Sequence, residues 1–238
     1  MSLLSRHALF RLSALGLALV LPATSPAQQR PVVDRLAQTY GLGSFTQIEA
    51  IRYTFSAQLP GIVLSRSWVW EPKTEQVTYE GKDKAGQPVK LSYQRSQISG
   101  QAAEIEASFV NDNYWLLLPF HVAWDTDAKV EDAGAQKLPL GEGSADKIVV
   151  KYPSDGGFSP GDTWDLYVGD GRIKEMVFHR GGTAKPGLVA ASWTDYRQAG
   201  PLLFSLEHRG TADGKPMHVS LSNIAVKLAG SNTWVEAH

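Results

Sequence analysis

The chain has 238 residues and is close to neutral, with 23 Lys and Arg against 24 Asp and Glu and a formal net charge of −1. It contains no cysteine, which excludes disulfides, thiolate metal sites, a cysteine nucleophile and a lipid-modified cysteine anchor. Phosphate binding depends on concentrated Lys and Arg, so this charge balance argues against a nucleic-acid partner.

The first 27 residues have the pattern of a signal peptide. Arg6 and Arg11 give a basic start, residues 12–21 form an apolar run, and Ser25-Pro26-Ala27 offers small residues for cleavage. The run is too short for the ~20 residues that a transmembrane helix needs, and no later segment is long and apolar enough. We therefore predict a signal peptide over 1–27, no transmembrane anchor, and a periplasmic or secreted protein whose residues 28–238 form a single β-rich domain.

A helix is expected at the start of the mature chain, from Pro31 to Tyr40. Proline suits the first helical position, Val33, Leu36 and Tyr40 recur at helical spacing, and Gly41 is a good stop. Because the helix has one apolar face, it should pack on the rest of the domain.

Alternating apolar and polar residues then continue almost to the C-terminus and predict about ten strands. Short polar loops at 81–86, 169–171 and around 213–214 separate successive segments, and their Gly and Asp-Gly content predicts β-hairpins. Short connections without long crossover helices indicate an antiparallel sheet, curled so that one face of each strand is buried. The segments are 51–56, 62–70, 76–79, 89–93, 148–152, 165–168, 173–178, 203–208, 217–221 and 224–228, the last two joined across a kink near Asn223.

Two regions break the alternation. Residues 102–109 could form a short helix, and Tyr114–Trp124, which follows, is the most apolar stretch of the mature chain. We interpret this apolar block as a buried central strand or short helix; the alternative is a mobile cover over an apolar pocket. Pro119 disfavours a continuous central strand. Residues 125–147 contain three glycines and are predicted to be a loop-like excursion within the domain.

No catalytic, metal or cofactor motif is present in the sequence. His121 and Asp125 are four residues apart, and His208 and His218 flank a predicted hairpin, where they could be cross-strand neighbours on the surface. Neither pair makes a zinc site, which needs more ligands. The acidic residues at 162, 165 and 170 miss the calcium-loop spacing, and no Gly-x-Ser-x-Gly motif occurs. We expect no metal, no cofactor and no enzymatic activity, although an exported hydrolase stays open.

The order of elements resembles the periplasmic lipoprotein-carrier superfamily, the LolA/LolB-like proteins. An opening helix leads through Phe45–Ile48 into a strand and a meander, which ends with Asp165–Val168, Asp170–Ile173 and then Ser192–Arg197 before Gly200-Pro201. The resemblance implies a half-open antiparallel β-barrel with helices covering a hydrophobic cavity. It also implies that lipids or lipoproteins are carried.

These observations predict a mainly β protein, with a single antiparallel sheet curled into a half-open barrel, one N-terminal helix and a short covering helix or loop. Its predicted function is to bind a lipid, acyl chain or other apolar ligand in the concave sheet. The alternative is an envelope protein–protein interaction module. Most of the aromatic residues could be sheet core, and the ones predicted to face a cavity are Phe55, Trp68, Trp70, Tyr93, Trp115, Phe120, Trp124 and Phe178.

Overall fold

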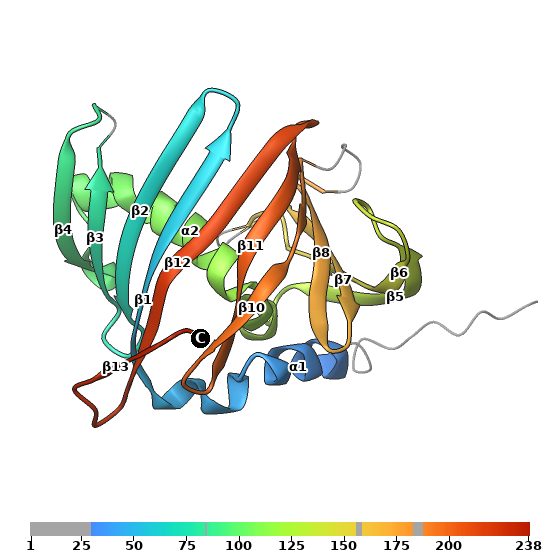
Figure 1. Ribbon diagram of the computed structural model, residues 1–238, viewed down its shortest axis with the longest axis horizontal. Helices are drawn as coiled ribbons and strands as arrows, with labels where there is room; N and C mark the ends of the chain where they lie inside the picture. The colour runs from blue at the N-terminus through green and yellow to red at the C-terminus, as the bar shows by residue number, and fades with distance from the viewer. Residues whose placement is uncertain (1–29, 84, 156–158, 183–187) are drawn as a thin grey trace, which may run out of the picture.

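The computed structural model describes residues 30–83, 85–155, 159–182 and 188–238, so the predicted signal peptide lies outside the described residues. The described residues form one antiparallel sheet of 13 strands in the order β4-β3-β2-β1-β12-β11-β9-β8-β7-β6-β5, with β10 paired to β11 and β13 to β12. The outermost strands β4 and β5 do not pair with each other, so the sheet curls without closing (Figure 1). The predicted fold class, a half-open antiparallel sheet, is confirmed.

The strands have these bounds: β1 Ile48–Leu59, β2 Ile62–Glu71, β3 Gln76–Lys82, β4 Pro88–Gln94, β5 Lys129–Lys137, β6 Ser144–Lys151, β7 Thr163–Gly169, β8 Arg172–His179, β9 Val189–Ser192, β10 Thr194–Ala199, β11 Leu202–Ala212, β12 Lys215–Leu228 and β13 Trp234–Glu236. The helices are α1 Arg30–Thr39, α2 Gln101–Trp124 and two short 3-10 helices, η2 Leu42–Gln47 and η3 Arg95–Gln97. Figure 1 shows α2 crossing one face of the sheet, behind β1, β2 and β12 in this view, while α1 lies at one end of the sheet.

Helix α2 contains both segments that broke the strand pattern. The short helix expected over 102–109 is its first part, and the apolar block Tyr114–Trp124 is its second part, so the central-strand interpretation of that block is wrong. Leu116, Leu117 and Leu118 are all buried, as expected for a helix that is apolar on every side. Pro119 kinks the helix without ending it, because the distortion is taken up at Leu117 (φ −123°, ψ 22°).

The predicted hairpins are confirmed by their turns. Asp170 and Gly171 have φ of 54° and 71°, and Asp213 and Gly214 have φ of 50° and 74°. Positive φ at both central residues is the tight hairpin turn that Asp-Gly favours. Asn223 has φ 53° within β12, close to the register shift against β1, which explains the kink predicted there.

The prediction of a loop over 125–147 is wrong, because this region contains β5 and leads into β6. Most residues of β5 are exposed, since it is an edge strand with a register shift between Asp132 and Ala135. A polar, bulged edge strand has no alternating apolar pattern, which is why its sequence resembles a loop.

Candidate functional site

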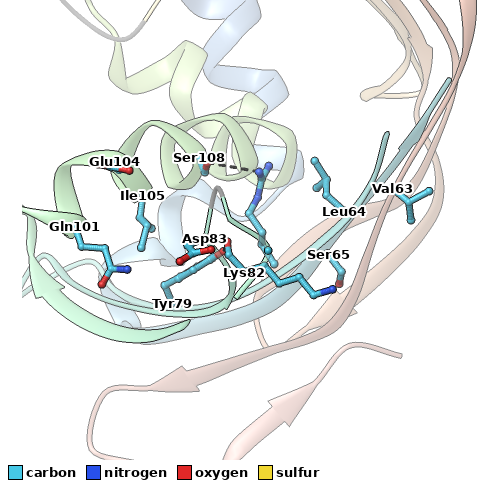
Figure 2. A pocket seen from close by; sticks show the side chains of 12 residues that line it. Val63, Leu64, Ser65, Tyr79, Lys82, Asp83, Gln101, Glu104, Ile105 and Ser108 are labelled. Carbon is cyan, nitrogen blue, oxygen red and sulfur yellow. Dashed lines mark hydrogen bonds between the residues drawn. The ribbon is translucent and has the colours of Figure 1, made fainter. Parts of the chain in front are cut away.

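A hollow lies between the first half of α2 and the concave face of β2 and β3. Its volume is about 630 Å³. We call it the α2–β2 cavity, and Figure 2 shows it with side chains from the helix on one side and from the strands on the other. The residues that line it are Val63, Leu64, Ser65, Arg66, Tyr79, Lys82, Asp83, Gly86, Gln101, Glu104, Ile105 and Ser108.

The alternation of β2 explains why the cavity forms here. Trp70 and Trp68 point into the concave face and are buried, whereas Arg66 and Leu64 on the same face are only partly buried and Ile62 is exposed. Burial therefore decreases along β2 toward the β1–β2 turn. The concave surface of β2 near this turn is therefore left open beside α2 and becomes one wall of the cavity (Figure 2).

The helix wall follows from the periodicity of α2. Gln101, Glu104, Ile105 and Ser108 recur at spacings of three and four residues, so they share one side of the helix. Ile105 is buried and Ser108 lies next to Arg66, whose guanidinium donates to the Ser108 hydroxyl at 3.5 Å. The helix thus contributes one apolar side chain and several polar ones.

Arg66 is fixed by Asp112, a fully buried carboxylate on α2. The Arg66 Nε donates to Asp112 Oδ2 at 2.7 Å and a terminal nitrogen donates to Oδ1 at 2.6 Å. Trp68 Nε1 donates to Oδ2 at 2.9 Å, and Asn111 donates to Oδ1 at 3.0 Å. Burial raises the pKa of the Asp112 carboxyl, and the hydrogen bonds from Arg66 oppose that rise. This pair ties the middle of α2 to β2 at the edge of the cavity.

The rest of the cavity combines an apolar floor with a polar rim. Leu64, Tyr79 and Ile105 supply apolar surface, and Lys82 and Asp83 stand where β3 ends. The Asp83 carboxylate accepts from the backbone N–H groups of Ala85 and Gln87, at 2.9 and 2.8 Å, and so closes the β3–β4 turn. Such a surface suits a molecule with one apolar and one polar part.

A second hollow, the aromatic cavity, lies beside the middle of α2 next to β7, β8 and β9. Its volume is about 320 Å³, and it shares no described lining residue with the α2–β2 cavity. The rings of Trp164 and Phe178 are 4.6 Å apart between centroids, and Tyr114 stacks on Trp164 at 6.1 Å. The lining residues are Ala107, Val110, Asn111, Tyr114, Trp115, Ser159, Asp162, Trp164, Met176, Phe178, Arg180, Leu188 and Val189.

The eight aromatic residues predicted from the sequence are distributed over three places. Trp115 and Phe178 line the aromatic cavity, and Trp70 and Trp124 line a shallow groove of about 360 Å³ beside Phe45. The other four lie in the core, namely Phe55, Trp68, Tyr93 and Phe120. None of the eight lines the α2–β2 cavity, although Phe55 lies under Arg66, 5.3 Å from its guanidinium carbon.

The lining residues that sequence reasoning missed are mostly polar or small. A signal was nevertheless present, because Arg66 interrupts the apolar positions Leu64, Trp68 and Trp70 on one face of β2. An arginine at such a position has to meet a buried acid or reach a polar hollow, and this one does both. Asp112, flanked in α2 by Asn111 and Asn113, is its partner.

The histidines occupy structural positions. His121 stacks on Tyr114 with ring centroids 3.9 Å apart and lies 2.8 Å from Asn113 Oδ1, and Asp125 accepts from the hydroxyl groups of Tyr114 and Tyr152. The prediction of a surface pair of His208 and His218 is wrong, because His208 is fully buried. The two are offset by one residue in the β11–β12 register, so their side chains leave opposite faces of the sheet. Within the described ranges, no three His, Asp or Glu residues are grouped to hold a metal ion.

In the part of the chain that the structure describes, no helix is both long and apolar enough to cross a membrane.

No protein-family model matches the chain, and no curated protein matches it. Among solved structures, it is similar to a DUF1329 family protein from Desulfovibrio piger, at 10% identity over 88% of this chain and 96% of that one, with a TM-score of 0.48. A putative outer membrane lipoprotein-sorting protein domain from Vibrio parahaemolyticus gives 9% identity, 87% and 95% coverage, and a TM-score of 0.49.

A LolA superfamily protein from Nitrosomonas europaea gives 10% identity, 82% and 92% coverage, and a TM-score of 0.44. At these identities and TM-scores the similarities say nothing about what this chain binds. The order of elements in the sequence resembles the LolA/LolB-like superfamily. A solved structure of a LolA superfamily protein is also among the structures similar to this chain.

Proposed function

We propose that this protein binds an amphipathic, lipid-like molecule in the α2–β2 cavity. The observation that carries the proposal is a hollow of about 630 Å³ between the covering helix and the concave sheet, with an apolar floor and a polar rim. Ligand sites are typically ~300–1,000 Å³, mostly apolar, with a few polar groups that orient the ligand. The apolar part of the ligand would lie on Leu64, Tyr79 and Ile105, and its polar part would meet the rim.

Binding is favoured over catalysis by the chemistry of the lining. The cavity has two serines, Ser65 and Ser108, but none of its described lining residues is a histidine, so a serine–histidine pair is not assembled there. The lipid or lipoprotein carriage that the sequence resemblance implies would be one form of this binding. Export to the periplasm or outside the cell, expected from residues 1–27, would give access to such ligands.

A substitution on the cavity floor tests the proposal. Leu64→Glu places a carboxylate on the apolar floor at a partly buried position, so the fold should survive. Leu140→Glu is the matched control, because Leu140 is exposed in the β5–β6 connection and does not line this cavity. We expect Leu64→Glu to weaken binding of a dansyl-labelled fatty acid by about tenfold or more, since burial of an unpaired charge is costly. If the wild type binds no such probe, or if both variants bind equally, the proposal is wrong.

The second candidate function is an interaction module, and the exposed apolar start of β2 favours it. Ile62 is 51% exposed and Val63 is 83% exposed, which is unusual for two adjacent large apolar residues. A protein partner in the envelope would cover them. Pull-down of the Ile62→Ser variant against the wild type, from envelope extracts, tests this, because Ile62 does not line the α2–β2 cavity. A partner that is lost with this variant while fatty-acid binding is retained would support the alternative.

A further inference from the structure

The aromatic cavity has features of a binding site separate from the α2–β2 cavity. Its walls come from the middle of α2 (Tyr114, Trp115), from β7 (Trp164) and from β8 (Met176, Phe178). Trp115 and Phe178 are only partly buried, unlike most of the large aromatic residues in the core. An apolar hollow with incompletely packed rings gains dispersion energy when a flat apolar group fills it.

Two polar residues line this cavity beside the rings. Ser159 is only 6% exposed and carries a hydroxyl. Arg180 lines the same cavity, and over the described ranges its guanidinium forms no ion pair. A guanidinium and a hydroxyl both donate hydrogen bonds, so together they suit a ligand group that accepts them.

The acidic residue at the rim of the cavity does not neutralise the Arg180 guanidinium. Asp162 also lines the cavity, but its Oδ1 accepts from the backbone N–H of Gly181 at 2.8 Å, and it is not within ion-pair distance of Arg180. One donor hydroxyl and one guanidinium beside an aromatic hollow match a carboxylate joined to a ring.

We propose that the aromatic cavity binds a small aromatic carboxylate, with its ring among Trp115, Trp164 and Phe178 and its carboxylate facing Ser159 and Arg180. The volume of about 320 Å³ lies at the small end of ligand sites, which favours one or two fused rings over a long acyl chain. This site is independent of the α2–β2 cavity and adds a second ligand class to the protein.

Calorimetric titration with 2-naphthoate and with its neutral counterpart 2-naphthalenemethanol tests the proposal. The wild type should bind naphthoate about tenfold more tightly than the alcohol, because a charge-assisted hydrogen bond is stronger than a neutral one. Arg180→Gln should lower naphthoate affinity to that of the alcohol and leave the alcohol unchanged. Arg197→Gln, an exposed arginine on β10, is the matched control and should change neither.

A second variant tests the place of the ring. Ala107 is exposed on α2 at the edge of the cavity, so Ala107→Trp should fold and fill the hollow. It should abolish binding of both probes, while Leu64→Glu in the other cavity should leave both intact. The proposal is overturned if the wild type binds neither probe, if Arg180→Gln leaves naphthoate affinity unchanged, or if Leu64→Glu abolishes naphthoate binding. If Leu64→Glu loses fatty-acid binding but keeps naphthoate binding, the change is confined to the α2–β2 cavity.

Discussion

Arg66 of β2 donates two hydrogen bonds to the carboxylate of Asp112 of α2, from Nε to Oδ2 at 2.7 Å and from a terminal nitrogen to Oδ1 at 2.6 Å. Asp112 is fully buried and the Arg66 side chain is mostly so. The pair joins the covering helix to the concave sheet at the border of the α2–β2 cavity, so it controls both the position of α2 and the shape of the cavity wall.

Removal of one partner of this pair should be strongly destabilising. Arg66→Leu leaves the Asp112 carboxylate buried without its cation, and such broken pairs cost ~3–5 kcal/mol of unfolding free energy. Urea denaturation gives the value. The exposed pair of Arg197 and Asp195 is the control, and Asp195→Asn should cost less than ~1 kcal/mol.

The double variant Arg66→Met/Asp112→Leu sharpens this prediction. It removes both charges and should recover much of the stability lost by Arg66→Leu, because apolar residues of similar volume often replace a buried pair without cost. A loss of less than ~1 kcal/mol in Arg66→Leu would mean that the pair does not hold α2 in place.

Acidification should destabilise the fold through two histidines, His208, which is fully buried, and His121, which is partly buried. Burial lowers the pKa of His121 and of His208 from 6.5 to about 3. Between these values the unfolded chain binds protons that the folded chain does not, so the unfolding free energy falls as pH drops from 6.5 toward 3. Each histidine contributes up to ~1.4 kcal/mol per pH unit.

His208→Phe isolates one of these contributions. The His208 ring lies 4.6 Å from Trp193 and 5.2 Å from Trp115, and neither of its nitrogens is hydrogen-bonded to a described residue. A phenyl ring should fit this apolar environment. Stability measured by urea at pH 6.0 and 4.5 should then depend on pH less steeply, by ~1.4 kcal/mol per unit. An unchanged slope would show that His208 takes up protons in the folded state.

Trp68→Ala and Trp115→Ala should differ in cost. Trp68 is buried between Tyr79 and Phe109, so its truncation should cost the ~3–5 kcal/mol of a core aromatic residue. Trp115 borders the aromatic cavity and already lacks neighbours on one side, so its loss should cost less and leave the protein folded. Thermal unfolding compares the two. Equal losses, with both variants unfolded, would make Trp115 a plain core residue.

The expected cleavage after Ala27 remains a prediction about residues outside the described ranges. Expression of the full chain in a Gram-negative host, followed by N-terminal sequencing of the envelope fraction, should give Gln28 as the first residue. Recovery of the intact Met1 end from the cytoplasm would contradict the export prediction.

Local chemistry in the sequence was sufficient for most of the strands and for the hairpins. Asp170-Gly171 and Asp213-Gly214 need positive φ at two successive residues, and few other residue pairs accept it, so the turns could be placed without knowledge of the fold. The strands between them alternate because one face packs on the core. These signals act over a few residues, and the sequence therefore determined the antiparallel meander and the opening helix α1.

Tertiary structure alone decided what the apolar block Tyr114–Trp124 became. An apolar run of this length suits a buried strand or a buried helix equally, and its surroundings select between them. Here the run continues from the helix over 102–109 and crosses the hollow of the sheet, where most of its residues are buried. The strand β5 shows the opposite effect, since an exposed edge leaves no apolar pattern to detect.

The cavities also depend on contacts between residues far apart in the chain. Leu64 and Ile105 line one cavity because the fold places β2 beside α2, and Ser159 and Arg180 line another with Trp115 because β7 and β8 lie beside the same helix. No local pattern records such distances. Residue periodicity determined which side of each element is apolar, and the curvature of the sheet against α2 decided where that apolar surface remains uncovered.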